Sequence, residues 1–485
     1  MTKSIDIKEA YTQAGQGHLF MFWDELSEDE QNSFLEQLSK LSNPSKFISE
    51  VSQAIQFSAN NSKSRKLSPL PASCYTSNLD VDSKTSLHWT EFGFEQLKQN
   101  KVGIILMAGG QGTRLGSSAP KGCYDVGLPS HKSLFQIQAE RIVRLKQLTE
   151  SKFGLASGSV SVPLYVMTSG PTRVATETFF SEHGYFGLDK ADVTFFNQGV
   201  LPAVSLDGKK LLLDSKNSIV ESPDGNGGLY KALADNKIIE DFKRRGIEHI
   251  HMYCVDNILV KVGDPEFIGY SALRNCDVAT KVVRKRDANE SVGLVVLNEA
   301  TNSPCVVEYS EISKDLSEMT EADGKLRFRA ANIVNHYYNV DFLNKMVPQW
   351  ILSRKDLPYH IAKKKIGVLD TVSGKFVKPT EPNGIKMEQF IFDVFPGVSL
   401  DKFGCLEVER NDEFSPLKNG PDVANDSPIS CKSNFLKRST AWVVANGGIL
   451  ETEDSLVEVS PLTSYGGEGL KNLVAGKTFK NGDIL

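Results

Sequence analysis

The amino-acid sequence predicts an α/β fold with a central mixed, mainly parallel sheet flanked by helices, a small helical N-terminal domain and a small β-rich C-terminal domain. From residue 89 onward, apolar strand-like runs alternate with amphipathic segments of helical period, which is typical of a parallel sheet covered by helices. The length of 485 residues allows about three domains. We therefore expect domains at residues 1–88, 89–400 and 401–485.

The N-terminal region is predicted to be helical and to end in an extended connector. In the stretch LSEDEQNSFLEQLSKL, Ser27 and Glu30 have the spacing of a capping box, and the apolar residues after them recur on one face of a helix. Residues 58–87 are rich in serine and asparagine and contain SPLP, so we expect extended chain there.

The central domain is expected to contain alternating strands and helices. Strands are predicted at 102–109, 163–170, 192–199, 249–257, 292–299 and 305–311, and helices at 134–148 and 229–246. Ligands of such sheets bind beyond the carboxyl ends of the strands. Residues 442–462 read WVVANGGILETEDSLVEVSPL, and this strand-like, glycine-containing stretch indicates the β-rich C-terminal domain.

Composition and charge are those of an ordinary globular enzyme. Hydrophobic residues make up 40% and charged residues 24%, and the formal net charge is −5, which argues against a general nucleic-acid or anionic-membrane surface. The seven cysteines form no CxxC pair, and the N-terminus has no apolar stretch of the kind found in a secretory signal. We therefore expect a cytoplasmic protein with reduced thiols, and a monomer by default.

A glycine-rich loop follows the first central strand. After VGIIL (102–106), residues 107–121 read MAGGQGTRLGSSAPK, with glycines at 109, 110, 112 and 116 and cations at Arg114 and Lys121. Glycines let the backbone approach a ligand closely, and successive N–H groups in such a turn form an anion-binding concavity that a following helix start would strengthen. The loop therefore suits a polyphosphate.

Two common phosphate-binding loops do not match this spacing. A dinucleotide-binding loop needs G-x-G-x-x-G and an acidic residue about 20 positions later, whereas the loop reads G-x-G-x-x-x-G from Gly110 and no acidic residue lies between Asp125 and Glu140. A Walker loop needs G-K-[ST], but Lys121 follows Pro120 and precedes Gly122. A tight turn without a ligand would leave the two cations unexplained.

The stretch MAGGQGTRLGSSAPKGCYDVGLPS resembles the nucleotide-binding signature of the eukaryotic UDP-N-acetylglucosamine pyrophosphorylases. The likeness continues in order through NQG (197–199), PDGNGGLY (223–230), VDN (255–257), VGLV (292–295), VEYSE (307–311), NIVNH (332–336), NGIKMEQFIFD (383–393) and EFSPLKN (413–419). Two departures from the family pattern are Met107 in place of leucine and Cys123 in place of methionine.

The resemblance implies a nucleotidyltransferase with a glycosyltransferase-A-like, Rossmann-like central domain. Its implied substrates are UTP and N-acetylglucosamine 1-phosphate, and its implied products are UDP-N-acetylglucosamine and pyrophosphate. UDP-glucose pyrophosphorylases carry a different loop without the Gln-Gly-Thr-Arg run, so the loop favours the N-acetylhexosamine branch.

The resemblance also implies roles for individual residues. The catalytic cations on the phosphates are Arg114, Lys121 and Lys418, with Lys386 as a further phosphate contact. The residues expected to line the uridine are Met107, Ala108, Gly109, Gly110, Gln198 and Gly225. The residues expected at the sugar are Asn226, Gly293, Glu308 and Asn335, with Tyr309, Phe390 and Phe392 near the acetyl methyl group.

Asp256 is the expected ligand of Mg²⁺. It follows the apolar strand HIHMYCV, and Mg²⁺ prefers carboxylate and phosphate oxygens. A role for Asn257 beside it is left open. No histidine shows a general-base or metal-ligand pattern, and phosphate nucleophiles are already ionised at pH 7, so no general base is needed.

Two alternatives to this function stay open. The same chemistry on N-acetylgalactosamine, glucose or galactose 1-phosphate would change only the sugar. A nucleotide-sugar sensor without turnover would be expected to lack one of Arg114, Lys121 or Asp256, and all three are present.

Overall fold

The chain forms two compact units, each assembled from separate segments. The computed structural model describes residues 2–60, 66–309 and 311–485. Unit 1 comprises Met1–Arg65, Gln198–Ala232 and Pro348–Val394, and unit 2 comprises Lys66–Asn197, Leu233–Val347 and Phe395–Leu485. This division differs from the three consecutive domains expected at 1–88, 89–400 and 401–485, because both ends of the chain join segments that are distant in sequence.

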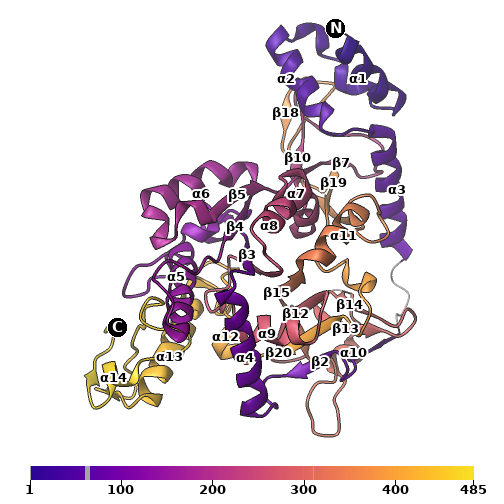
Figure 1. Ribbon diagram of the computed structural model, residues 1–485. Helices are drawn as coiled ribbons and strands as arrows, with labels where there is room; N and C mark the ends of the chain where they lie inside the picture. Colours follow the sequence, from indigo (N-terminus) through magenta and orange to yellow (C-terminus); the bar gives the residue numbers. More distant parts are fainter. Residues whose placement is uncertain (1, 61–65, 310) are drawn as a thin grey trace. The chain divides into compact units, whose positions relative to one another are not determined.

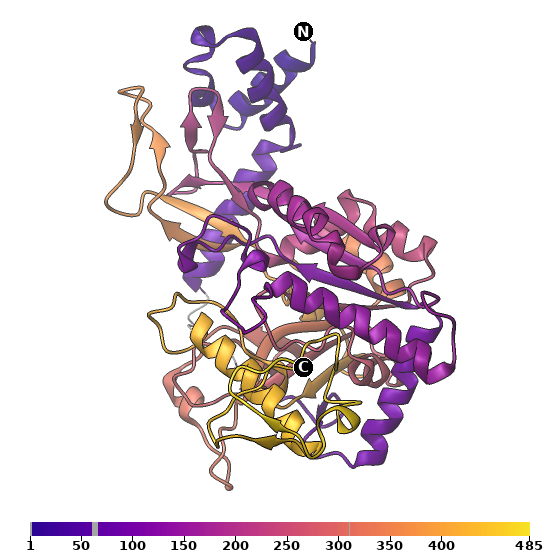
Figure 2. The same cartoon turned by 90° about the vertical axis from the view of Figure 1, so that its left-hand side faces the viewer.

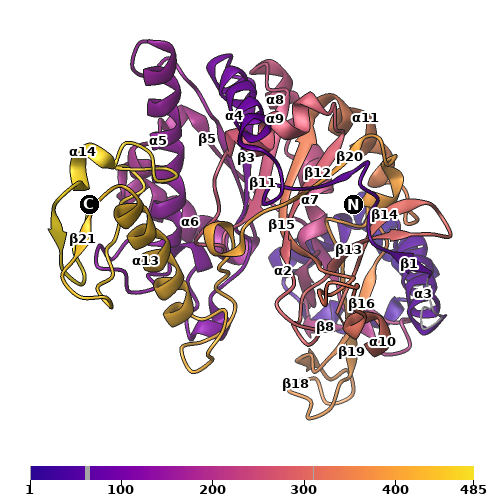
Figure 3. The same cartoon turned by 90° about the horizontal axis from the view of Figure 1, so that it is seen from below.

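The core of unit 2 is a mixed sheet, as predicted. Its strand order is β2-β20-β12-β15-β11-β3-β4-β5 (Figure 3). Strand β15 is antiparallel to both of its neighbours, and the other pairs along this path are parallel. The strands are β2 (Tyr75–Ser77), β20 (Phe403–Glu407), β12 (Val278–Arg284), β15 (Ala330–Asn339), β11 (His249–Cys254), β3 (Val102–Met107), β4 (Leu164–Thr168) and β5 (Val193–Asn197), with β1 (Leu67–Ser68), β13 (Leu294–Asn298) and β14 (Ser303–Val307) attached beside them.

Helices cover both faces of this sheet. Ile142 of α5 and Phe267 of α9 share one core with Ile104 of β3, whereas Phe242 of α8 packs edge-on against Tyr165 of β4. Helices α4 and α9 lie side by side (Figure 1). The helices of this unit are α4 (Ser83–Lys98), α5 (Leu134–Phe153), α6 (Gly170–Glu182), α8 (Ile238–Arg244), α9 (Pro265–Leu273), α10 (Lys314–Glu318), α12 (Arg410–Glu413), α13 (Pro428–Ala445) and α14 (Lys471–Val474).

The β-rich C-terminal domain expected from sequence is corrected by the structure. Helix α13 includes Val443 and Val444, the first two valines of the stretch that suggested strands, and after this helix only the short strands β21 (Ile449–Leu450) and β22 (Thr478–Phe479) occur among the described residues. Ser427 caps the helix in a capping box and Pro428 occupies its first turn. The helix lies along α5 (Figure 2), and Phe435 shares a core with Ile137.

Unit 1 combines the N-terminal helices with short strands from two distant segments. Its helices are α1 (Thr2–Gln13), α2 (Glu28–Ser39) and α3 (Pro44–Asn60), and the expected capping box at Ser27 and Glu30 is present. Its strands are β6 (Val200–Pro202), β7 (Val204–Ser205), β8 (Leu213–Ser215), β9 (Ser218–Ile219), β10 (Glu221–Pro223), β16 (His360–Lys364), β17 (Val368–Leu369), β18 (Phe376–Val377) and β19 (Gly384–Glu388). Phe34 and Phe47 share a core with Val204 and Ile385, which joins the three segments.

Two further helices contain positions at which the chain leaves one unit and enters the other. Helices α7 (Leu229–Asp235) and α11 (Val340–Trp350) each include such a point. The single helical stretch expected at 229–246 is divided into α7 and α8, because Lys237 adopts a left-handed conformation with φ +54°. Of the expected connector 58–87, residues 61–65 lie outside the described residues, and α3, β1, β2 and α4 occupy parts of the rest. No helix within the described ranges has the length and apolar character that a membrane crossing requires.

Candidate functional site

The glycine-rich loop begins at the carboxyl end of β3. The six residues of β3 are buried between β11 and β4, so the strand is a rigid base for the loop. The Ala108 N–H donates to the carbonyl of Met167 at 2.8 Å, and the Met107 carbonyl accepts from the Val255 N–H at 3.1 Å. Both neighbouring strands therefore fix the point at which the loop starts.

The loop is closed by its own backbone. The Gly112 N–H donates to the Ala119 carbonyl at 3.0 Å, and the Lys121 N–H donates to the Gly110 carbonyl at 3.1 Å. Gly116 alone among the glycines of this fully described loop has positive φ, at +75°. The expected helix start is replaced by short 3₁₀ turns at Thr113–Leu115 and Lys121–Cys123, because α5 begins only at Leu134.

Three consecutive amides in this loop have no partner in the described parts of the chain. The N–H groups of Gly109, Gly110 and Gln111 donate to no described residue. The Gly109 carbonyl, in contrast, accepts from the Ser169 hydroxyl at 2.7 Å, which fixes the peptide group that carries the Gly110 N–H. Unpaired successive N–H groups of this kind bind anions.

Three cations and one carboxylate of unit 2 lie near these amides. Arg114, Lys121 and Lys418 form no ion pair with any described residue, and the Asp256 carboxylate likewise has no hydrogen bond or ion pair within the described ranges. Burial raises the pKa of the Cys254 thiol, the Asp256 carboxylate raises it further, and Lys418 and Lys121 lower it. All three charges are therefore within electrostatic range of Cys254, the last residue of β11.

The segment that carries Lys418 is attached to the strand exit that carries Asp256. The Leu417 N–H donates to the Asp256 carbonyl at 2.8 Å. A Cβ added to Gly420 would lie 3.0 Å from the Arg114 carbonyl oxygen, so the glycine-rich loop passes directly beside this segment. These contacts bring together the segments that carry Arg114, Lys121 and Lys418, the expected phosphate contacts, and Asp256, the expected Mg²⁺ ligand.

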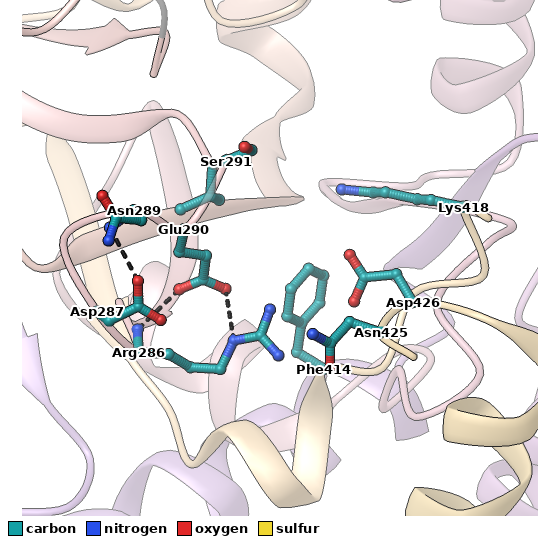
Figure 4. A pocket seen from close by; sticks show the side chains of 10 residues that line it. Arg286, Asp287, Asn289, Glu290, Ser291, Phe414, Lys418, Asn425 and Asp426 are labelled. Carbon is teal, nitrogen blue, oxygen red and sulfur yellow. Dashed lines mark hydrogen bonds and ion pairs between the residues drawn. The ribbon is translucent and has the colours of Figure 1, made fainter. Parts of the chain in front are cut away.

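Lys418 also lines a cavity of about 490 Å³. Figure 4 shows its side chain extending along one wall, opposite the loop that carries Arg286 and Glu290. Glu290 is bound by Arg286 at 3.1 Å and by Arg410 at 2.9 Å. The Lys418 Nζ lies 5.9 Å from the centroid of the Phe414 ring. The lysine therefore faces open space in which a phosphate could reach it.

Two of the expected sugar-binding residues of unit 2 lie side by side. A Cβ added to Gly293 would lie 3.0 Å from Oε1 of Glu308. The Gly293 carbonyl accepts from the Asn332 N–H at 2.8 Å, and the Asn332 side-chain oxygen accepts from the Val334 N–H at 3.0 Å. Tyr309 is 53% exposed and directly follows Glu308.

Asn335 does not join this group, which corrects the expectation that it contacts the sugar. Its side-chain oxygen accepts from Nε2 of His251 at 2.7 Å, and Nδ1 of His251 accepts from the Gly263 N–H at 2.8 Å. Asn335 is only 1% exposed. Its amide is therefore part of the interior between β11 and β15, and Asn332 is the asparagine of NIVNH that lies next to Gly293.

The predicted residues of unit 1 form a separate group. The Gly227 N–H donates to the Gln389 carbonyl at 2.8 Å, and the Asn226 side-chain oxygen accepts from the Ile391 N–H at 2.9 Å. A Cβ added to Gly225, whose φ is +86°, would lie 2.5 Å from the Gln389 oxygen. The Asp224 N–H donates to the Gly199 carbonyl at 3.2 Å, which brings the adjoining Gln198 to the same turn. These contacts bring Gln198, Gly225 and Asn226 to the exit of β19.

Aromatic side chains extend this group in unit 1. The ring centroids of Phe390 and Phe392 are 5.3 Å apart, and the His360 ring stacks on Phe390 with centroids 4.1 Å apart. His360 Nε2 also contacts Asp393 at 2.9 Å. Phe392 is buried and Phe390 is half-buried, whereas Lys386 on β19 makes no ion pair with a described residue.

Comparison with known proteins gives the chain its family. A family model described as UTP–glucose-1-phosphate uridylyltransferase matches residues 45–475. The chain belongs to this family. The UDP-N-acetylglucosamine pyrophosphorylase of Saccharomyces cerevisiae is 52% identical over 99% of both chains, and the human UDP-N-acetylhexosamine pyrophosphorylase-like protein 1 is 42% identical over all of this chain and 97% of its own length.

A solved structure agrees with the fold. The uridine diphosphate N-acetylglucosamine pyrophosphorylase of Trypanosoma brucei superposes with a TM-score of 0.84 at 28% identity, covering 98% of this chain and 95% of the other. The predicted family and the predicted fold are therefore both confirmed.

Two residues of this candidate site were missed from the sequence. Ser169 fixes the Gly109 peptide through its hydroxyl, and Asn332 adjoins Gly293. Ser169 could have been found, because it is a polar residue at the carboxyl end of a predicted parallel strand, beside the strand that leads into the loop.

Proposed function

We propose that this chain is a uridylyltransferase that makes UDP-N-acetylglucosamine and pyrophosphate from UTP and N-acetylglucosamine 1-phosphate. The observation that carries this proposal is the set of unpartnered amides at Gly109, Gly110 and Gln111, described above, beside cations without ion pairs. The anionic oxygens of a polyphosphate would accept hydrogen bonds from these amides and pair with these cations. The name of the yeast relative supports the choice of nucleotide and sugar.

The chemistry needs positioning and charge neutralisation more than proton transfer. An oxygen of the sugar phosphate attacks the α-phosphorus of UTP in line, the bond to the bridging oxygen breaks, and pyrophosphate leaves. Negative charge develops on the groups entering and leaving the phosphorus. We assign Arg114 to the β- and γ-phosphates, Lys121 to the α-phosphate and Lys418 to the same reacting region, while the amides of the loop hold the nucleotide in register.

Three buried histidines of unit 2 fit a reaction without a general base. Burial lowers the pKa of His249 and of His251 to about 4, and burial lowers that of His336 to about 3. All three rings are enclosed by the sheet and its helices. They are therefore neutral structural groups at pH 7, and the incoming phosphate is already ionised.

The donor set at Asp256 fits Mg²⁺. One carboxylate without a protein partner, close to phosphate-binding cations, matches an ion that binds through one or two carboxylates, water and substrate phosphates. No cluster of three or more metal-binding side chains occurs among the described residues, so substrate oxygens would complete the coordination. When bound, Mg²⁺ would neutralise phosphate charge.

For the sugar we propose Gly293, Glu308 and Asn332. Glu308 can accept hydrogen bonds from hexose hydroxyls, and the side-chain nitrogen of Asn332 can donate to an acceptor such as the acetamido carbonyl. The roles of Tyr309 and of the unit 1 residues Gln198, Gly225, Asn226, Lys386, Phe390 and Phe392 stay predictions, as do the monomeric state and the cytoplasmic location.

Pyrophosphate release tests the proposal. The purified chain is incubated with UTP, Mg²⁺ and either N-acetylglucosamine 1-phosphate or glucose 1-phosphate, and kcat/KM is compared. We expect a clear preference for the N-acetylated sugar. Because the family model is described by glucose 1-phosphate, faster turnover of glucose 1-phosphate would favour that second function, and binding without turnover would favour a sensor.

A further inference from the structure

Asn257 has a buried side chain that links two segments of the site. It is 4% exposed and directly follows Asp256. Its Nδ2 donates to the Glu413 carbonyl at 2.7 Å, and its Oδ1 accepts from the Ser415 N–H at 3.0 Å and from the Leu259 N–H at 3.2 Å. One amide therefore holds both its own loop and the segment that leads to Lys418.

The backbone alone provides only part of this link. Asn257 faces Pro416 in an isolated antiparallel bridge, with hydrogen bonds from Leu417 to Asp256 and from Ile258 to Ser415. Pro416 has no N–H to donate. The side chain of Asn257 supplies the bonds to Glu413 and Ser415 that the main chain leaves unmade.

The far end of the linked segment is anchored by buried charges. The Glu413 carboxylate binds Lys281, which also binds Asp264 at 2.5 Å, and it lies 3.4 Å from Lys261. Lys281 is fully buried, and although burial lowers its pKa, Asp264 and Glu413 raise it by more. These ion pairs therefore hold Glu413 in place, and the hydrogen bond from Asn257 connects Glu413 to the end of β11.

We propose that Asn257 is a positioning residue for uridylyl transfer, which holds the backbone of Lys418 in register with Asp256. This inference rests on the proposed function, because it assumes that Lys418 acts on the reacting phosphates. A catalytic group displaced by about 1 Å can lose about 100-fold in rate. Because the Lys418 side chain is flexible, the position of its ammonium group relative to the phosphates depends on the position of its backbone.

A double-mutant cycle tests this role. Asn257→Ala, Lys418→Ala and the double variant are compared with the wild type for kcat and for both KM values. We expect Asn257→Ala to lower kcat by about 10- to 100-fold with KM for the sugar phosphate changed less than about 3-fold. In the Lys418→Ala background, the same change should lower kcat by less than about 3-fold, since the group that it positions is gone.

A matched control separates positioning from general destabilisation. Asn446 also links two segments, through bonds to the Trp442 and Gly467 carbonyls, so Asn446→Ala should leave kcat near the wild-type value. Without substrates, hydrogen exchange at the Ser415 and Leu417 amides should speed up at least about 10-fold in Asn257→Ala. If that variant does not fold, Asn257→Asp takes its place, because it keeps the acceptor oxygen and loses the donor to Glu413.

Either of two results would overturn the proposal. One is an equal loss of kcat from the Asn257 change in both backgrounds, and the other is unchanged exchange at Ser415 and Leu417 with kcat within about 3-fold of wild type. A wild-type chain that makes no UDP-N-acetylglucosamine would instead overturn the proposed function, and this is measured first.

Discussion

Lys121 contributes both to the conformation of the glycine-rich loop and to the positive charge of the site. Its N–H closes the loop onto Gly110, and its side chain has no ion-pair partner in the described part of the chain. Removing one donor of this kind typically lowers kcat by about 10²–10³. We expect that loss for Lys121→Ala in steady-state assays.

The control for this prediction is Lys98→Ala. Lys98 forms a surface ion pair with Glu95 at 3.3 Å, and such pairs contribute little, so its kcat should match the wild type. A loss of less than about 3-fold for Lys121→Ala would contradict the assigned role.

Gly293 provides a second test at the level of one residue. A methyl group there would lie 3.0 Å from the Glu308 carboxylate, so the carboxylate must shift from the position in which we propose that it binds the sugar. Loss of a hydrogen bond to a charged group amounts to about 1.5–3 kcal/mol, and we expect Gly293→Ala to raise KM for the sugar phosphate by about 10-fold or more while KM for UTP is unchanged. At Gly397 a Cβ meets no described heavy atom within 4 Å, and Gly397→Ala should be silent. Equal changes in both KM values would argue against the sugar assignment.

The two asparagines of NIVNH show how far sequence can specify such a site. From this motif we predicted Asn335 at the sugar, whereas the structure places Asn332 next to Gly293. Val334 adopts φ +51°, and the pairing of β12 with β15 shifts register between Thr280 and Val282. This irregularity breaks the alternation of side chains that would otherwise assign each residue to a face. The bonding partners of Asn332 and Asn335 therefore had to come from the structure.

At the level of the elements, two glycines allow helices α4 and α9 to pack in close contact. A Cβ on Gly93 would lie 1.8 Å from the Pro265 carbonyl oxygen, and one on Gly269 would lie 1.8 Å from that of Trp89. Overpacking typically lowers stability by about 1–3 kcal/mol, occasionally more. We expect either alanine variant to lower the free energy of unfolding of unit 2 by an amount at the upper end of that range, which appears as a lower midpoint of urea unfolding.

Gly466→Ala is the control for these two variants. A Cβ added to Gly466 would meet open space, with no described heavy atom within 4 Å, so Gly466→Ala should unfold at the wild-type midpoint. Identical midpoints for the Gly93 and Gly466 variants would show that the helices can separate without loss of stability.

Helix α13 explains why one element was misread from the sequence. Its last turn contains Trp442, Val443 and Val444, which favour strands when taken alone. The signals for a helix lie 15 residues earlier, where Ser427 and Pro428 begin it, and its buried face recurs at Cys431, Phe435 and Ser439. By contrast, β3 was predicted correctly because a fully buried parallel strand is apolar along its whole length.

For the whole molecule, the sequence predicted the sheet but not the division into units. Phe34 and Phe47 in the N-terminal helices share a core with Val204 and Ile385. No local pattern encodes such contacts between segments that are hundreds of residues apart. Alternation of strands and helices, in contrast, is a local property and was enough to identify the sheet.

The stability of the whole chain should fall in mild acid because of its buried histidines. His249, His251 and His336 have pKa values lowered to about 4, 4 and 3, whereas an unfolded histidine titrates near 6.5. Between these values the unfolded chain binds protons that the folded chain does not, so stability is fully present above about pH 6.5 and falls as the pH drops toward 4. Each histidine contributes about 1.4 kcal/mol per pH unit in that window.

Thermal unfolding between pH 7 and pH 5 measures this dependence. His336→Leu removes one of the three groups, so the slope attributable to these histidines should fall by about a third. A slope identical to that of the wild type would show that His336 becomes protonated without unfolding.

A crystal structure of the chain with UDP-N-acetylglucosamine bound would show directly whether the glycine-rich loop binds the nucleotide. We expect the diphosphate beside the N–H groups of Gly109, Gly110 and Gln111, with Lys121 in contact with it. A nucleotide bound elsewhere, with this loop facing solvent, would rule out the proposed phosphate site.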